Sequence, residues 1–179
     1  MQWKPAAGLM LIPVAALIAP AVAHAKIFVG VEEIQQRIFP GQKLTLNPLA
    51  LTEAQRDKMQ ELSSVREPFR GERVWKTAKG DWFIVDEVVG KHEMVKYAIG
   101  INADGTIKGI EIMEYVESYG YEVGEASWRN QFVGKTSEAT LKLNKDIKNI
   151  SGATLSCKHL TDGVKRLMVM HDLVLKGSK

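Results

Sequence analysis

The stretch from residue 73 to residue 115 constrains the fold of this chain more than any other part of the sequence. It holds four segments rich in β-branched and aromatic residues, and short turns that contain glycine separate them. Segments of this kind form β-strands, and turns of this composition join antiparallel neighbours. The sequence therefore predicts a four-stranded antiparallel meander. Its strands cover residues 74–77, 82–89, 94–101 and 106–115.

Helical patterns flank these strands on both sides. A short pattern over residues 31–39 ends at Pro40-Gly41. Thr52, with Gln55 three residues later, forms a capping box that starts a second helix. Near the C-terminus, five side chains, four of them apolar, recur at the spacing of one face of a third helix. They are Leu160, Val164, Leu167, Met168 and His171. The predicted fold class is α+β, a twisted antiparallel sheet with helices packed on it in a single domain.

A six-residue segment, Ser-Gly-Ala-Thr-Leu-Ser over residues 151–156, lies where that last helix begins. Thr154 falls at or just before the helix N-terminus, where unpaired N–H groups and the positive end of the helix dipole stabilise an anion. Gly152 and Ala153 carry too little side chain to block a phosphate. The Thr154 hydroxyl could contact such a phosphate or be esterified to it. The alternative is an ordinary N-cap, because Ser and Thr are favoured before helices for reasons unrelated to ligands.

This segment resembles the flavinylation motif of the FMN-binding domain family. The domain occurs in the C subunit of the sodium-translocating NADH:quinone reductase and in the G subunit of the Rnf complex. In that family the last Thr of an [ST]-G-A-T motif carries FMN through a phosphoester bond, attached by a dedicated flavin transferase. Two upstream segments also resemble the family in the same order. Residues 117–120 (ESYG) stand where members carry an E-T-P-G-like loop, and residues 128–135 (WRNQFVGK) look like W-x-x-Q-F-x-G-K.

The resemblance implies a cofactor site with FMN bound covalently to Thr154. The other site residues that it implies in the motif are Ser151, Gly152, Ala153 and Leu155. It also implies that Glu117 and Ser118 hydrogen-bond the flavin, with Gly120 beside the ring. Without the family, residues 117–120 are a turn that closes a strand. Nearby aromatic side chains either line the flavin or belong to the core. They are Tyr115, Tyr119, Tyr121 and Trp128.

The chain departs from the family pattern at two positions. Lys148 stands where the family often has an Asp, three residues before the Ser of the motif, and the nearest acid is Asp146. Tyr119 replaces the proline of the upstream loop. Both departures bear on how well the flavin transferase recognises the site.

The first residues indicate export. Lys4 gives a positive start, residues 8–22 are apolar, and Ala23-His24-Ala25 is a small-x-small cleavage site. The apolar stretch is short for a membrane span of about 20 residues. We therefore expect a periplasmic protein, with an uncleaved anchor in the inner membrane, facing the periplasm, as the alternative. The expected organisation is a signal peptide over 1–25, an N-terminal helical segment over 26–69 and the FMN-binding domain over 70–179.

Other chemistries find little support in the sequence. Acidic and basic residues are interspersed and the formal net charge is +3, so no nucleic-acid partner is expected. Cys157 is the single cysteine, which excludes a disulfide within this sequence; we expect a structural thiol, although the nearby helix start could lower its pKa. The histidines lack metal-ligand spacing, so no metal site is expected. Three basic residues of the last helix are expected on its solvated face. They are Lys158, Lys165 and Arg166.

Together these features predict an exported flavoprotein that transfers electrons between membrane or periplasmic redox partners. We expect an electron carrier more than an enzyme in its own right, with no catalytic residue of its own. One alternative is an exported flavin-dependent reductase that acts on a small-molecule acceptor. The other is a flavin-free periplasmic binding or adaptor module.

Overall fold

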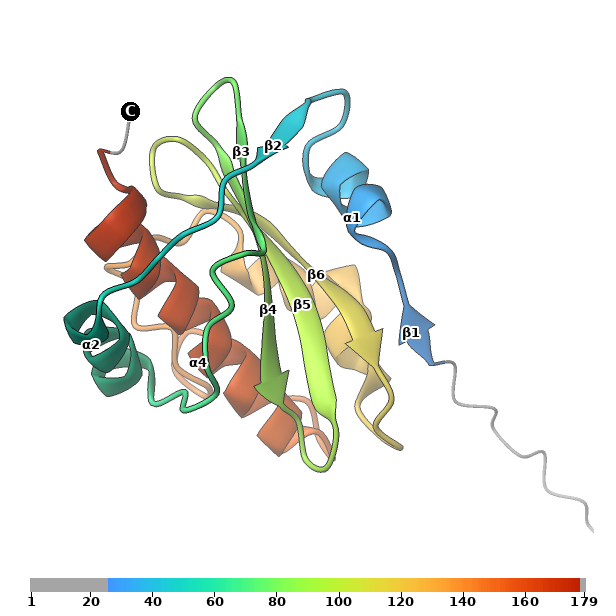
Figure 1. Ribbon diagram of the computed structural model, residues 1–179. Helices are drawn as coiled ribbons and strands as arrows, with labels where there is room; N and C mark the ends of the chain where they lie inside the picture. Colours follow the sequence, from blue (N-terminus) through green and yellow to red (C-terminus); the bar gives the residue numbers. More distant parts are fainter. Residues whose placement is uncertain (1–25, 178–179) are drawn as a thin grey trace, which may run out of the picture.

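The computed structural model describes residues 26–177, and its centre is a six-stranded antiparallel sheet (Figure 1). The strand order is β1-β6-β5-β4-β3-β2. The strands are β1 (Ile27–Phe28), β2 (Leu44–Leu46), β3 (Val74–Thr77), β4 (Trp82–Val89), β5 (Met94–Ile101) and β6 (Ile107–Tyr115). The predicted meander and the α+β class are confirmed, and two short edge strands are added to the sheet. The signal peptide predicted for residues 1–25 lies outside the described residues.

The helices surround this sheet. They are α1 (Val31–Ile38), α2 (Glu53–Ser63), α3 (Ala126–Arg129) and α4 (Thr154–Met170), and short 3₁₀ or π turns follow β6, α3 and α4. The predicted capping box of α2 is present: Gln55 N–H donates to Thr52 Oγ1 at 3.2 Å, and Thr52 N–H donates to Gln55 Oε1 at 2.9 Å. Among residues 26–177, no helix combines the length and the apolar character needed to cross a membrane.

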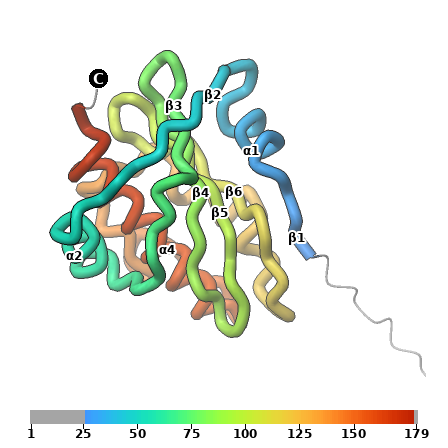
Figure 2. The backbone as a smooth tube through the Cα atoms, in the orientation of Figure 1, coloured from blue at the N-terminus to red at the C-terminus, as the bar shows by residue number. Residues whose placement is uncertain are grey.

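The sheet separates two apolar layers, which follow from the alternation of side chains along each strand. On β4, Phe83 and Val85 point to the face that α1 covers, whereas Ile84 and Val88 point to the opposite core. In that opposite core α4 packs on β4 and β5, and α2 packs on α4. Figures 1 and 2 show α1 on one side of the sheet and α4 with α2 on the other. Thus residues 26–69 supply both edge strands and one covering helix on each face.

One basic residue of α4 lies inside the protein. The prediction of a solvated face is wrong for Arg166, which is 2% exposed. Its Nη2 lies 2.6 Å from both carboxylate oxygens of Asp86 on β4, and the Tyr97 hydroxyl donates to the same carboxylate at 2.8 Å. Desolvation acts to lower the pKa of Arg166, but Asp86 outweighs it and raises this pKa. The charged pair therefore joins α4 to the sheet.

Candidate functional site

Thr154 is the first residue of the 17-residue helix α4, and its side chain is exposed. The cap position is Ala153, so no side-chain oxygen caps the helix. The interpretation of Thr154 as an ordinary N-cap is therefore wrong. N–H groups in the first turn of a helix lack intrahelical acceptors, and the helix dipole adds positive charge there. The Thr154 hydroxyl thus stands at an end of α4 that favours an anion.

The residues before Thr154 form a tight turn that leaves this helix end open. Ala153 N–H donates to Ile150 O at 3.1 Å, and Gly152 has a φ of +84°. Glycine takes this left-handed conformation without strain. No atom lies within 4 Å of the position of a Cβ on Gly152, whereas Ala153 is buried. Ser151 and Leu155 are exposed, so the predicted motif residues other than Ala153 face solvent beside Thr154.

The loop after β6 packs directly against the motif. A Cβ on Gly120 would overlap the Ala153 Cβ and would lie 2.8 Å from Tyr115 Oη. The Tyr115 hydroxyl donates to Tyr119 O at 2.6 Å and also lies 3.2 Å from Ser156 Oγ. Burial raises the pKa of Tyr115, so the phenol keeps its proton, and because it has only one, Ser156 must be the donor in the second bond. Two of the three family-like segments therefore meet at the start of α4.

The third family-like segment holds the chain that leads into the motif. Trp128 Nε1–H donates to Lys148 O at 2.8 Å, and Lys148 N–H donates to Gln131 Oε1 at 2.8 Å. Trp128 is buried and packs edge to face on Phe132, with ring centroids 5.2 Å apart. Trp128 and Gln131 thus fix both backbone groups of Lys148, six residues before Thr154.

Asp146, the acid nearest to Lys148 in the sequence, is engaged by its own turn and by a lysine. Asp146 accepts the N–H groups of Leu141 and Lys142 at 3.0 and 2.8 Å, and Lys135 Nζ lies 3.5 Å from its carboxylate. Partial burial acts to raise the pKa of Asp146, but these N–H groups and the lysine outweigh it and lower the pKa. Asp146 therefore stabilises its own turn.

The side chain that does contact Thr154 was missed by sequence reasoning. Asn149 Nδ2–H donates to Thr154 Oγ1 at 2.9 Å. Asn149 Oδ1 is buried and has no hydrogen-bond partner in the described part of the chain. No spacing rule signals this contact, because it depends on the turn at Gly152 that brings residue 149 back to the helix start.

Glu117 is engaged by a turn of the protein itself. Its Oε1 accepts the N–H groups of Lys91, His92 and Glu93 in the β4–β5 turn, at 2.5, 2.7 and 3.0 Å. Burial acts to raise the pKa of Glu117, but the three N–H groups outweigh it and lower the pKa. A Cβ on Gly90 would lie 2.5 Å from the same oxygen and 3.0 Å from Glu93 O, so a side chain at this position would displace the Glu117 carboxylate. Hydrogen bonds from Glu117 and its exposed neighbour Ser118 to a flavin stay predictions.

The remaining candidates are placed as follows. Tyr115 and Trp128 belong to the core, whereas Tyr119 is 71% exposed beside the motif. Cys157 is buried, and this burial raises its pKa, so the expectation that the helix start could lower it is wrong. Within residues 26–177 no three His, Cys, Asp or Glu side chains gather in a way that could hold a metal ion.

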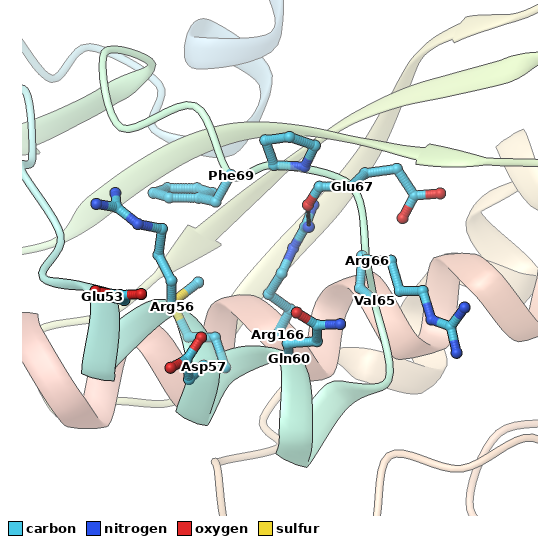
Figure 3. Close-up of a pocket in the computed structure, with 11 residues that line it drawn as sticks. Glu53, Arg56, Asp57, Gln60, Val65, Arg66, Glu67, Phe69 and Arg166 are labelled. Carbon is cyan, nitrogen blue, oxygen red and sulfur yellow. Dashed lines mark hydrogen bonds between the residues drawn. The ribbon is translucent and has the colours of Figure 1, made fainter.

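The hollows on this face of the sheet include one of about 200 Å³ lined by residues 64–67 and by Lys158, His159 and Asp162 of α4, and two larger ones. One begins beside the motif, has a volume of about 270 Å³ and is lined by Trp128, Gln131 and Ile150 among others. The other, also about 270 Å³, lies between α2 and residues 65–69 and is reached by Arg166 (Figure 3). Arg166 is about 18 Å from Thr154 along α4, at 1.5 Å per residue. Its hollow is therefore remote from the motif and does not support the reductase alternative.

Two sequence comparisons bear on this part of the chain. Residues 90–169 match the family model of the FMN-binding domain. The chain is also 34% identical over 79 residues to the G subunit of the Na(+)-translocating ferredoxin:NAD(+) oxidoreductase complex of Acetobacterium woodii. That alignment covers 39% of this chain and 38% of the relative.

These matches identify an FMN-binding domain of this family in the chain, as the sequence predicted. The residues present fit the phosphate end of FMN. An exposed hydroxyl stands at an uncapped helix start, Gly152 leaves the approach open, and a buried amide oxygen beside the hydroxyl has no partner among the described residues.

Proposed function

We propose that this protein is an exported electron carrier that holds FMN through a phosphoester on Thr154. The observation that carries the proposal is the place of Thr154, the exposed first residue of an uncapped helix. One upstream family-like segment packs against the residue before it, and the other holds the chain that leads to it. The FMN-binding domain match supports the cofactor, and the similarity to a subunit of an oxidoreductase complex supports a role in electron transfer.

In this proposal, different parts of the motif bind the phosphate of FMN and leave space for it. The first-turn N–H groups of α4 and its dipole stabilise the phosphate, and Gly152 leaves space for it. In the attachment step, Thr154 Oγ1 would form a bond to phosphorus, the bond from phosphorus to a leaving group would break, and the hydroxyl proton would pass to a base of the transferase or to water. A flavin dinucleotide supplies that leaving group as a nucleoside monophosphate. When bound, FMN supplies the redox chemistry, which no side chain of this site can perform.

The exposure of the site allows two kinds of partner to approach it, the flavin transferase and the electron-transfer proteins. A flavin transferase must reach the Thr154 hydroxyl, which the exposed neighbours Gly152 and Leu155 permit. Membrane or periplasmic electron-transfer proteins must approach a cofactor attached there, and exposed apolar side chains of Tyr119 and Leu155 flank the attachment point. A covalent link also keeps the cofactor in a compartment where a dissociated one would be diluted away.

The test is the intact mass of protein exported by a bacterial host that contains the flavin transferase. We expect the mass of a chain that begins at Lys26, increased by FMN minus one water. The Thr154→Val variant should be exported equally well but lack the increase, whereas Thr154→Ser keeps a hydroxyl and should retain some. An apo mass for exported wild-type protein would rule out attachment at Thr154. Recovery from washed membranes with Met1 intact would support the anchored alternative.

A further inference from the structure

Asn149 is the side chain that holds the Thr154 hydroxyl. Its Nδ2–H donates to Thr154 Oγ1 at 2.9 Å. We propose that Asn149 is a positioning residue for the modification of Thr154, which it prepares by donating this hydrogen bond. The inference rests on the proposed function, since it concerns how FMN becomes attached.

The backbone on either side of Asn149 is fixed. Both backbone groups of Lys148 are bonded to the side chains of Trp128 and Gln131, and Ile150 O accepts Ala153 N–H at 3.1 Å. The Asn149 side chain therefore starts from a rigid position and ends on Thr154. An exposed threonine at a helix start would otherwise exchange between rotamers. The amide restricts this exchange and keeps Oγ1 in one direction.

The contact with Thr154 leaves the other end of the Asn149 amide without a partner among the described residues. Oδ1 is buried without a hydrogen-bond partner in the described residues. An unpaired buried acceptor loses its hydrogen bonds to water without replacement, which destabilises a protein. An apolar side chain of similar size would leave no buried acceptor unpaired. Packing alone therefore does not account for an asparagine here, and the Nδ2–H group is the part of its side chain that makes a contact. That donor group is bonded to the Thr154 hydroxyl.

An amide donor suits Thr154 both before and after attachment. The hydroxyl oxygen can accept one hydrogen bond while its second lone pair remains free to attack the incoming phosphorus and its proton remains free to pass to a base of the transferase or to water. When the ester has formed, that oxygen has no proton and can only accept, so Nδ2–H remains a compatible partner for it or for a neighbouring phosphate oxygen. Asn149 gains and loses no proton in this step. An ionised carboxylate in its place would have no donor and would repel the phosphate.

The test measures the rate of FMN attachment by purified flavin transferase with a flavin dinucleotide, followed by intact mass. Asn149→Ala and Asn149→Asp should both slow attachment about tenfold at neutral pH, the loss expected for one hydrogen bond. The rate of Asn149→Asp relative to wild type should recover as the pH falls, because a protonated carboxyl again carries an O–H donor. Asn149→Ala should show no such recovery. The exposed Asn130→Ala variant is the matched control and should react at the wild-type rate.

A second measurement needs no flavin. In the apo protein, nuclear magnetic resonance couplings that report the Thr154 side-chain rotamer should indicate one rotamer in wild type and an average in Asn149→Ala, at similar unfolding temperatures. Wild-type rates in both Asn149→Ala and Asn149→Asp would overturn the positioning role and leave the proposed function intact. Absence of FMN from wild-type protein would overturn both, and the apo spectra would then assign the contact a structural role only.

Discussion

Two features of the structure require glycine at position 120, its backbone conformation and the space beside it. Its φ is +85°, and its missing Cβ leaves room for Ala153 and for Tyr115 Oη. The sequence pointed to close approach at this position, and the structure shows that the approaching group includes the motif itself. Gly120 therefore determines how closely the loop after β6 can pack against the start of α4.

We expect Gly120→Ala to destabilise the protein by about 2–4 kcal/mol. Positive φ accounts for about 1–2 kcal/mol of this, and overlap with Ala153 and Tyr115 for the rest. Gly134→Ala is the matched control, because Gly134 has a φ of +77° with no atom within 4 Å of a Cβ position. Gly134→Ala should lose only the stability that the positive φ accounts for, about 1–2 kcal/mol. Urea unfolding of the two apo variants measures the difference. Equal losses would mean that the loop relaxes away from the motif.

Features that depend on neighbouring residues in the sequence could be predicted. Contacts between residues that lie far apart in the sequence could not. The placement of Thr154 at a helix start and the glycine at 152 follow from local patterns. The three N–H groups on Glu117 come from a turn 24–26 residues away, so no local pattern shows that its carboxylate is already engaged. Asn149 was missed for the same reason, because its contact depends on the turn that reverses the chain before α4.

At the scale of helices and strands, the length of an element determined whether it could be predicted from the sequence. Strands β3 to β6 were predicted because their apolar runs are separated by recognisable turns. The edge strands β1 and β2 have only 2 and 3 residues, too few to show any periodicity. The charge of Arg166 favoured solvent, and its burial depends on Asp86, 80 residues earlier in the chain. The sequence therefore did not predict the pairing of the short edge strands or the ion pair between α4 and the sheet.

Helix α4 has a glycine in its interior for a reason of packing. Glycine destabilises a helix interior by about 1 kcal/mol relative to alanine. A Cβ on Gly163, however, would lie 2.6 Å from Tyr97 Oη and 2.8 Å from Val88 Cγ1. The close approach of α4 to β4 and β5 thus outweighs helix propensity at this position.

We therefore expect Gly163→Ala to destabilise the protein by about 1–3 kcal/mol although alanine favours helix. The loss should be smaller in a Tyr97→Phe background, because that change removes the hydroxyl oxygen that the new Cβ meets. A double-mutant cycle by urea unfolding measures this coupling. A gain in stability for Gly163→Ala, or the same loss in both backgrounds, would show that α4 does not press on Tyr97.

At the scale of the whole molecule, the ends of α4 lie in contrasting surroundings. Its N-terminus is exposed at Thr154, whereas its C-terminus leads into a π turn over His171–Leu175 whose first and last residues are buried. His171 is 4% exposed, and its ring faces the β5–β6 turn, where a Cβ on Gly105 would lie 3.3 Å from the imidazole. The core therefore anchors one end of α4, which leaves the other available for the cofactor.

Burial of His171 makes the stability of the whole fold depend on pH. Desolvation lowers the pKa of His171, and Lys176 acts in the same direction, while Asp172, with Oδ1 3.7 Å from Nδ1, opposes them. Its pKa is thus lower in the folded than in the unfolded chain, where it is about 6.5. Between these two values the unfolded chain binds more protons, so stability must fall as the pH falls. The pKa values of Glu117 and Asp146 are also lowered, but from ordinary carboxylate values of about 4, so their loss occurs in a separate, more acidic range.

We expect the free energy of unfolding of the apo protein to be independent of His171 above about pH 7 and to decline by about 1 kcal/mol per pH unit just below pH 6.5. The His171→Leu variant lacks the titrating group, so its stability should decline less over the same range, whatever its stability at pH 7. His171→Gln provides a polar replacement should leucine disturb the packing. Urea unfolding at half-unit pH steps measures the slopes of wild type and of both variants. Identical slopes for wild type and both His171 variants would show that His171 is already open to protons in the folded protein, and the C-terminal end of α4 would then be less firmly anchored than its burial indicates.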